Sequence, residues 1–385
     1  MKADLFAVPL PDETDAEERA RQVVLRAFAE REPVATQRKP RLRPAVLATA
    51  ALMAAAVAIA VSPAGSAILH SVRQAVGLKH AAPVLTRLPS TGDVLVTSTA
   101  GPWVVHPDGS KRLLGRYEQA SWSPHGLFVA VTRRHELLAV DPQGNVRWTL
   151  GRPGAVSLPR WSPDGYRIAY LDGRTLRIVA GDGTGDRAFA KAAGVAAAWM
   201  PSSTNEHLLA FVTTSQQLEL VDVDSGKVAA RTRLGAEPTE LMWSSDGRRL
   251  AVVASRTLTV FDRAGRRLDS IRLSRATGAA SFVPGSHDLT LVLKGRRSDA
   301  VTFDLDRLHR RPAEVFSGSG RFGALAWAPD GRWLLLTWPT ADQWLFVPAG
   351  DRTIVAVAGV ARQFAPGRGR AAQPLVNGWC CPPAG

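Results

Sequence analysis

Apolar residues in the longer part of the chain, from residue 93 onward, occur in short runs separated by Gly, Asp and Pro. Two examples are "YRIAYL" at 166–171 and "TLRIVAG" at 175–181. Short apolar runs bounded by turn-forming residues are typical of β-strands rather than of helices. The pattern therefore predicts an all-β region that extends over 93–366.

One pattern in this region, "WSPDGYRIAY" at 161–170, returns with variations at 122, 243 and 327. Weaker copies begin at 199 and 282, and "RQFAPG" supplies a further aromatic residue at 364. The aromatic residues of these copies are Trp122, Trp161, Trp199, Trp243, Phe282, Trp327 and Phe364. Successive members are 37 to 45 residues apart, which is close to the length of a four-stranded β-propeller blade.

Each copy reads as a short inner strand, a tight turn and three further strands. In the copy at Trp161, Asp164 and Gly165 suit the turn, because Gly tolerates positive φ and Asp hydrogen-bonds to its own turn. We expect the Trp side chain to pack between neighbouring blades, since it supplies a large apolar surface. The same turn residues recur as Asp246, Gly247, Asp330 and Gly331.

The two ends of the repeat region each hold part of a blade. Three predicted strands within 93–115 precede the first copy and have no inner partner, whereas "VARQFAP" at 360–366 has the inner-strand motif with no full blade after it. Joining the two gives one composite blade and predicts a seven-bladed β-propeller. A six-bladed ring with frayed ends is the alternative.

The motif Trp161-Ser162-Pro163-Asp164-Gly165 resembles the WD-repeat-like blades of TolB-type β-propellers, which also occur in the propeller domains of some peptidases. The resemblance covers 93–366, about 70% of the chain. It implies a propeller that serves mainly as a scaffold for binding. The copies at Trp199 and Phe282 depart from the motif, and TolB itself is a soluble periplasmic protein, so its partners are not carried over to this chain.

Residues 1–44 form a first segment, in which 11–33 has the pattern of one helix. Thr14 and Glu17 have capping-box spacing, and Pro33 ends the run. Its apolar stripe includes Val23, Val24, Ala27 and Phe28, which we predict to contact a membrane surface, a second copy of the chain or a partner protein. A lone helix of this length is marginally stable in water, so a frayed and solvated helix is the alternative.

A charge-free apolar stretch follows a basic cluster at 36–44, and we predict that 45–66 is a transmembrane helix. The basic cluster on its N-terminal side places the N-terminus in the cytoplasm and the propeller outside. A cleaved signal peptide is one alternative, because Ala64-Gly65-Ser66 resembles a cleavage site, although the charged leader is unusually long. A buried soluble helix is another.

Two further segments flank the predicted propeller. Residues 67–92 read as a stalk or linker, and 367–385 as a C-terminal tail that packs on the closing blade or contacts a partner. The two cysteines of the chain, Cys380 and Cys381, are adjacent in this tail. Neighbouring Cα atoms are about 3.8 Å apart, below the usual disulfide span, so we expect free thiols or bonds to another chain.

The chain is basic, with a net charge of +14 from 48 Lys and Arg against 34 Asp and Glu. A basic surface attracts nucleic acid, anionic lipid or anionic envelope polymer, although scattered solvated Arg gives the same total. No block of Lys and Arg interleaved with aromatic residues occurs in the predicted propeller. We therefore expect no nucleic-acid partner.

The sequence contains no complete motif for catalysis or for cofactor binding. "GSGRFG" at 318–323 has glycine-loop spacing, but an inner-strand motif follows it instead of a helix. "DVDSGK" at 222–227 resembles the start of a Ca²⁺ loop without the closing Glu. The eight His residues have no metal-ligand spacing, and no G-x-S-x-G motif is present. We predict no catalytic residue, no metal and no cofactor.

The sequence therefore predicts a single-pass membrane protein with a non-catalytic, extracytoplasmic propeller that binds a protein or an envelope polymer. The cytoplasmic helix would contact an intracellular partner, a layout that resembles transmembrane regulators such as anti-sigma factors. An envelope enzyme, a glycan hydrolase or lyase with a cluster of carboxylates at the propeller mouth, is the alternative. A purely structural stalked domain is the third.

Overall fold

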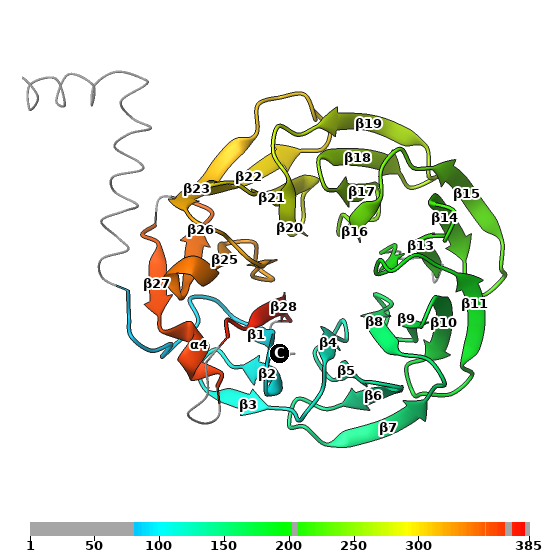
Figure 1. The fold of residues 1–385 in the computed structure, drawn as a ribbon, viewed down its shortest axis with the longest axis horizontal. Helices are drawn as coiled ribbons and strands as arrows, with labels where there is room; N and C mark the ends of the chain where they lie inside the picture. Colours follow the sequence, from blue (N-terminus) through cyan, green and yellow to red (C-terminus); the bar gives the residue numbers. More distant parts are fainter. Residues whose placement is uncertain (1–80, 202–206, 351, 366–371, 382–385) are drawn as a thin grey trace, which may run out of the picture. The chain divides into compact units, whose positions relative to one another are not determined.

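The computed structural model describes residues 81–201, 207–350, 352–365 and 372–381. These residues form seven four-stranded antiparallel sheets, arranged as blades around a central opening (Figure 1). Each blade contacts its two neighbours, and the last contacts the first. The described residues thus form an all-β, seven-bladed β-propeller, as the repeat predicted, and the six-bladed alternative is wrong.

Six blades are continuous in sequence, with the first strand beside the opening and the fourth at the outer rim. Blade 1 consists of β4 (Gln119–Trp122), β5 (Val129–Arg133), β6 (Glu136–Val140) and β7 (Val146–Gly151). Blade 2 consists of β8 (Val156–Trp161), β9 (Arg167–Asp172), β10 (Thr175–Ala180) and β11 (Arg187–Lys191). Blade 3 consists of β12 (Ala198–Trp199), β13 (Leu208–Val212), β14 (Gln217–Asp222) and β15 (Val228–Arg233).

The other three continuous blades follow the same order. Blade 4 consists of β16 (Pro238–Trp243), β17 (Arg249–Ala254), β18 (Thr257–Asp262) and β19 (Arg267–Arg272). Blade 5 consists of β20 (Thr277–Phe282), β21 (Asp288–Leu293), β22 (Arg297–Asp304) and β23 (Ala313–Ser319). Blade 6 consists of β24 (Leu325–Trp327), β25 (Trp333–Trp338), β26 (Gln343–Pro348) and β27 (Val355–Ala358), with a 3₁₀ turn at Pro339–Ala341.

The hydrophobic core lies between neighbouring blades. In β9 the four residues from Ile168 to Leu171 are all buried, because blades cover this strand on both faces. One core cluster joins Ala169 of blade 2 to Trp199 and Leu209 of blade 3. The outer strands, such as β7, alternate between exposed and half-buried residues. The short apolar runs in the sequence are therefore inner and middle strands that stacking removes from water.

The repeated aromatic residues lie at these blade boundaries. The indole Nε1 of Trp199 donates to the carbonyl of Arg160 in the preceding blade at 2.9 Å, and that of Trp243 donates to Ala198 at 3.2 Å. The indole of Trp327 donates to the Thr290 hydroxyl of blade 5 at 3.2 Å. Each of these Trp residues thus combines apolar contact with a hydrogen bond across a boundary.

Blade 7 closes the ring with the two ends of the described chain, but not with the predicted strand. Its outer three strands are β1 (Asp93–Ser98), β2 (Gly101–Val105) and β3 (Lys111–Leu113), and its inner strand is β28 (Leu375–Cys380). Trp379 pairs with Val94, as Trp161 pairs with Ile168 in blade 2. The Thr97 hydroxyl also donates to Asn377 Oδ1 at 2.7 Å.

The prediction that 360–366 is the inner strand of the closing blade is therefore wrong. Gly359 adopts a left-handed φ of 63°, and the chain then forms a one-turn helix, α4 (Val360–Gln363). Phe364 is buried beside Trp344, with ring centroids 5.3 Å apart, so its aromatic side chain belongs to the core rather than to the repeat. The closing strand lies in the segment that the sequence assigned to the tail.

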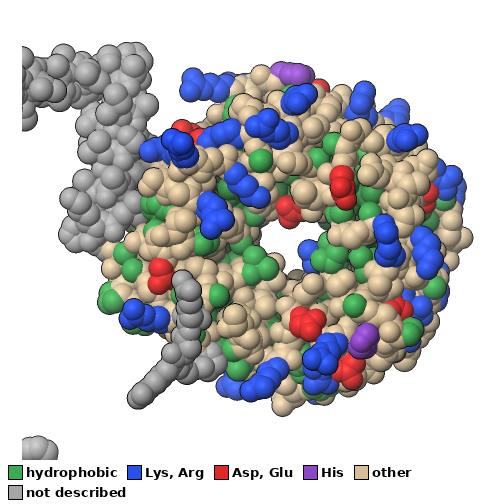
Figure 2. Space-filling model, in the orientation of Figure 1, with side chains coloured by type: hydrophobic (Ala, Val, Ile, Leu, Met, Phe, Trp, Pro, Cys, Tyr) green, Lys and Arg blue, Asp and Glu red, His purple; other side chains and the backbone are tan. Residues whose placement is uncertain are grey.

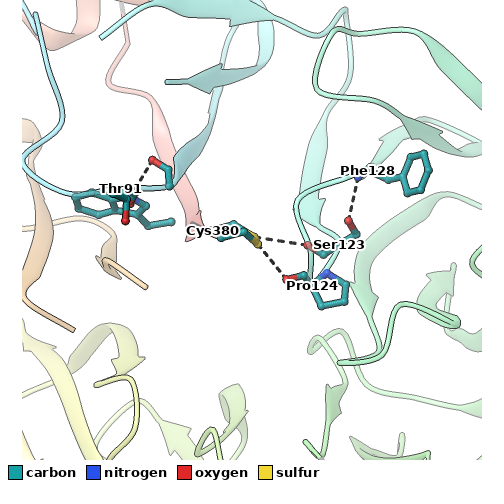
Figure 3. Close-up of a disulfide and its surroundings, with 8 residues drawn as sticks. Thr91, Ser123, Pro124, Phe128 and Cys380 are labelled. Carbon is teal, nitrogen blue, oxygen red and sulfur yellow. Dashed lines mark hydrogen bonds between the residues drawn. A yellow bond between two sulfur atoms is a disulfide. The ribbon is translucent and has the colours of Figure 1, made fainter. Parts of the chain in front are cut away.

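The cysteines at the end of β28 are bonded to each other, contrary to the expectation of free thiols. Side chains of successive strand residues point to opposite faces, but Cys381 has a left-handed φ of 51°, which turns both sulfurs to the same side. Cys381 Sγ lies 3.0 Å from the carbonyl oxygen of Pro124 and Cys380 Sγ lies 3.6 Å from that of Ser123 (Figure 3). The disulfide therefore packs against the first turn of blade 1.

The described part of the expected stalk packs on the propeller. Ala82 bridges Val357 of β27, and Leu85 and Leu88 are buried in the core cluster of blades 6 and 7. The predicted cytoplasmic helix with Val23, Val24, Ala27 and Phe28 and the predicted span 45–66 lie outside the described residues. Among the residues that the structure describes, no helix has the length and apolar character needed to cross a membrane.

Candidate binding site in the central channel

The inner strands surround a channel of about 1170 Å³ that opens on the face shown in Figure 2. Residues from β4, β8, β16, β20, β24 and β28 line it. Strand periodicity decides which of these side chains face the channel. In β16, Leu241 is buried between blades, whereas the alternate residues Glu240 and Met242 line the channel; the buried Trp243 at the end of the strand also reaches the lining.

Three charged side chains of the described residues line this channel: Arg160 at the end of β8, Glu240 in β16 and Lys294 directly after β21. Arg160 and Lys294 are exposed to the channel, and Glu240 is half-buried. The lining thus carries two cationic groups and one carboxylate. This excess of positive charge suits an anionic ligand group, and the narrow low-dielectric walls strengthen its field.

The charge of Glu240 depends on pH near neutrality. Burial raises its pKa to about 7, although the Arg160 charge and a hydrogen bond from the Ala280 backbone N–H act in the opposite direction. Enclosure by the blades likewise lowers the pKa of Arg160, and Glu240 partly offsets this effect. The channel is therefore most positive below neutral pH, where Glu240 is protonated.

The chemistry available in the channel is limited. Most glycoside hydrolases use two carboxyl groups that flank the scissile bond, and the described lining contains Glu240 as its one carboxylate. No group of three or more His, Cys, Asp or Glu in the described ranges is placed to hold a metal ion. The two motifs that resemble cofactor loops lie at strand connections: 222–227 begins at the end of β14 and leads to β15, and 318–323 begins at the end of β23 and leads towards β24.

The turn aspartates of the repeat make contacts between blades that the sequence did not reveal. Asp164 in the turn of blade 2 pairs with His207 of blade 3, and His207 also pairs with Asp224 of its own blade. Arg167 of blade 2 completes the set with a 3.1 Å ion pair to Asp224. Asp164 therefore links two blades in addition to accepting hydrogen bonds from Ser162 and the Tyr166 backbone within its turn.

The boundary between blades 4 and 5 repeats this arrangement. His287 lies 2.9 Å from Asp246 and 2.8 Å from Asp306, and Arg249 pairs with Asp306 at 2.7 Å. We call each four-residue set a polar quartet; the first is Asp164, Arg167, His207 and Asp224, and the second is Asp246, Arg249, His287 and Asp306. Corresponding members are 80 or 82 residues apart, a two-blade period that could have indicated the quartets from sequence.

The quartets shift the pKa values of their members. Burial alone lowers the pKa of His207, but hydrogen bonds to Asp224 and Asp164 outweigh it, so the net pKa is raised. Burial raises the pKa of Asp164, and its hydrogen bonds from Ser162, Tyr166 and His207 bring it below its ordinary value. The corresponding groups His287 and Asp246 shift in the same directions for the same reasons.

The Asp-Gly turn of blade 6 has a different partner from the turns of blades 2 and 4. Asp330 of blade 6 accepts a 2.8 Å hydrogen bond from the Ser90 hydroxyl, which precedes β1. Gly165, Gly247 and Gly331 all have φ between 67° and 79°, so each turn uses the left-handed conformation that glycine permits. The copies at Trp199 and Phe282, which depart from the motif, are the ones that supply His207 and His287.

Comparison with known proteins shows the fold alone. No protein-family profile and no curated protein sequence matches the chain. Among solved structures, it is similar to the β-propeller domain of Cps50 (Swd1) from Myceliophteria thermophila, with a TM-score of 0.50, 16% identity and coverage of 62% of this chain and 85% of that one. Hydrazine synthase from Kuenenia stuttgartiensis matches with a TM-score of 0.46 and 12% identity, over 60% of this chain and 75% of that one.

Proposed function

We propose that this protein is a membrane-anchored, non-catalytic binding module whose extracytoplasmic propeller holds its ligand at the central channel. The observation that carries the proposal is the pair of cationic side chains, Arg160 and Lys294, exposed in a channel with one carboxylate of raised pKa. A protein partner with acidic residues or an anionic envelope polymer has the charge to bind there. The seven-bladed fold supports a binding role, because propellers present rigid scaffolds for recognition.

The proposal places the propeller outside the cell by way of the predicted membrane span at 45–66 and the basic cluster before it. The motif resemblance to TolB-type propellers agrees with an envelope location. Reporter fusions at residues 30 and 385 test this topology: we expect them on opposite sides of the membrane. Both reporters on the same side would contradict the anchor.

The cytoplasmic helix at 11–33 would carry the signal of binding to an intracellular partner. The test replaces Val23, Val24 and Phe28 by polar residues and measures capture of cytoplasmic proteins by residues 1–44 together with the regulated response in cells. We expect both to be lost. Unchanged capture and regulation would remove the signalling role and leave the propeller's binding role intact.

The channel itself is tested by photocrosslinking in native membranes. A photoreactive amino acid replaces Met242, which lines the channel, and a control replaces Val228, which is 42% exposed on the outer strand β15. We expect a crosslinked product from position 242 that disappears in the double variant Arg160→Glu/Lys294→Glu. Products that are the same at both positions, or that persist in the double variant, would contradict a channel ligand.

The raised pKa of Glu240 is the one observation that favours the enzyme alternative. A carboxyl group with a pKa of about 7 is suited to general acid–base catalysis at neutral pH. The test is turnover of anionic and neutral envelope glycans by the wild type and by Glu240→Gln. Turnover that the substitution abolishes would replace the binding module by an enzyme.

A further inference from the structure

The boundary between blades 1 and 2 departs from the polar quartets found between blades 2 and 3 and between blades 4 and 5. The strand register aligns the blades, because Trp122 pairs with Val129 as Trp161 pairs with Ile168 and Trp199 with Leu209. At the aligned positions this boundary carries His125, Phe128, Tyr166 and Asp182 in place of Asp164, Arg167, His207 and Asp224. Phe128 and Tyr166 thus replace the Arg and His of the quartet, His125 replaces the turn Asp, and the second Asp is kept as Asp182.

A cleft of about 620 Å³ lies at this boundary, where the polar quartet is replaced, and we call it the blade 1–2 cleft. Its aromatic lining comes from both blades and consists of Phe128, Trp148, Trp161 and Tyr166. Phe128 stacks on Trp161 with ring centroids 6.4 Å apart. Tyr166 is 66% exposed, and Leu127, which precedes Phe128, is 62% exposed. Exposed large apolar side chains beside an apolar cleft are typical of a binding surface.

The two indoles of the cleft are partly covered by neighbouring residues. Trp161 is buried under Phe128, and the indole of Trp148 donates to the Gly181 carbonyl at 2.9 Å. The backbone at Gly183 lies against the same indole, since a Cβ at that position would come within 2.7 Å of the ring. Phe128 thus covers one face of the Trp161 indole, and the Gly183 backbone covers one face of the Trp148 indole. The exposed side chains of Tyr166 and Leu127 are suited to apolar contacts with peptide side chains.

Arg147 is the charged residue of the cleft that is best placed to meet an acidic group. Arg147, Arg167 and Asp182 line the cleft, and Arg167 is already paired with Asp224 in the first polar quartet. Arg147 is 55% exposed and uses Nη2 for Asp141 at 2.8 Å, so its other donors point to no residue that the structure describes. Asp182 is already engaged by the hydroxyl and the backbone N–H of Thr184. Charge complementarity therefore favours an acidic group at the Arg147 side.

We propose that the blade 1–2 cleft binds a short segment of a partner protein that places an aromatic side chain beside an acidic residue. The aromatic side chain packs against Phe128 and Tyr166 in the cleft, and the acidic residue pairs with the Arg147 guanidinium. This site lies between two blades and is separate from the channel, so the proposal goes beyond the ligand proposed there. A result that contradicts binding at one of the two sites leaves the proposal for the other unaffected.

The test selects random displayed peptides of about twelve residues on the full-length chain, because peptide grooves of this kind read a few anchor side chains. Peptides are then counter-selected on the triple variant His125→Asp/Phe128→Arg/Tyr166→His, which installs the residues of the polar quartets at this boundary. We expect the enriched peptides to contain Phe, Tyr or Trp next to Asp or Glu. We expect their binding to fall at least about tenfold in the triple variant, the loss typical of an interface hot spot.

A second variant keeps the test decisive if the triple variant does not fold. Tyr166→Ala changes an exposed side chain and should weaken the same peptides by about tenfold, with thermal unfolding unchanged. Leu268→Ala, at a 49% exposed position on β19 of blade 4, is the matched control and should bind as the wild type does.

Three results would overturn the proposal: enriched peptides without an aromatic residue, peptides that bind the Tyr166→Ala variant as well as the wild type, and no enrichment at all. A fourth is binding of oligosaccharides, tested with chitin and peptidoglycan fragments, that Tyr166→Ala removes while no peptide binds.

Discussion

The imidazole of His207 in blade 3 bonds to Asp164, the turn residue of the repeated motif in blade 2. The same side chain bonds to Asp224, so one histidine holds two carboxylates from adjacent blades. The motif that builds each blade thus also joins it to the next. This relationship depends on a residue from a copy in which the motif itself is degraded.

Removing this histidine should destabilise the propeller. In His207→Ala, Asp164 and Asp224 remain close together without the imidazole between them, so we expect a loss of about 1–3 kcal/mol in the free energy of unfolding. Urea denaturation followed by Trp fluorescence measures it. The control is His309→Ala, whose side chain is 74% exposed and pairs with Asp269; it should change stability by less than about 0.5 kcal/mol. Equal effects of the two substitutions would contradict the bridging role.

The contribution of the histidine bridges should depend on pH in a defined direction. Because the pKa of His207 and of His287 is raised above the ordinary 6.5, their contribution is full below that value and declines as pH rises through the folded-state pKa. The lowered pKa values of Asp164 and Asp246 give a contribution that is full above the ordinary 3.8 and declines as pH falls through the folded-state values.

The measurement for these bridges compares the wild type with His207→Asn/His287→Asn by thermal unfolding at about pH 5, 6.5 and 8, the range in which histidine titrates. We expect the stability difference to be largest at the lowest of these values and smallest at the highest. A difference that stays constant over the series would show that histidine protonation does not contribute.

Glu240 should make stability depend on pH in the opposite sense to an ion-paired carboxylate. Its pKa is raised from 4.5 to about 7, so the folded state binds the proton more tightly and stability falls as pH rises between these values. Glu240→Gln removes the cost of the buried charge and should be more stable than the wild type at pH 8 but equal to it near pH 4. A wild-type curve parallel to that of the variant would mean that Glu240 titrates normally.

Closure of the ring should depend on Trp379 rather than on the end of the predicted repeat at 366. Trp379 is buried, and its indole donates to the Thr91 carbonyl at 3.0 Å. Truncation to Ala removes this hydrogen bond and a large apolar surface, so we expect a loss of about 3–5 kcal/mol. Leu375→Ala, at a 58% exposed position in the same strand, is the control and should be nearly neutral. Equal stability of the two variants would show that β28 is not needed for closure.

Much of the fold was predictable from the sequence because it is encoded locally. The strands follow from short apolar runs, and the turns follow from Asp and Gly at fixed offsets from the aromatic residue. Their spacing gave the blade length and the count of seven. Spacing alone did not identify the closing strand. Phe364 follows Trp327 by one blade length, yet it lies after a one-turn helix and packs in the core.

The candidate site was much less predictable. Arg160, Glu240 and Lys294 lie in three different blades, and each is an ordinary charged residue in its local sequence. They meet because the ring brings the inner strands around one channel. The polar quartets left a weak signal in their two-blade spacing, whereas the aromatic replacements at blades 1 and 2 become visible after the strand registers are aligned.

The sequence by itself determined the blade, since hydrophobic periodicity and turn chemistry act between residues close in the chain. The tertiary structure decided which segment closes the ring, which histidine meets which aspartate, and which side chains share the channel. Asp93 and Cys380 pair although nearly the whole propeller separates them in sequence. Such pairings depend on the packing of all the blades, and the local pattern of either segment does not encode them.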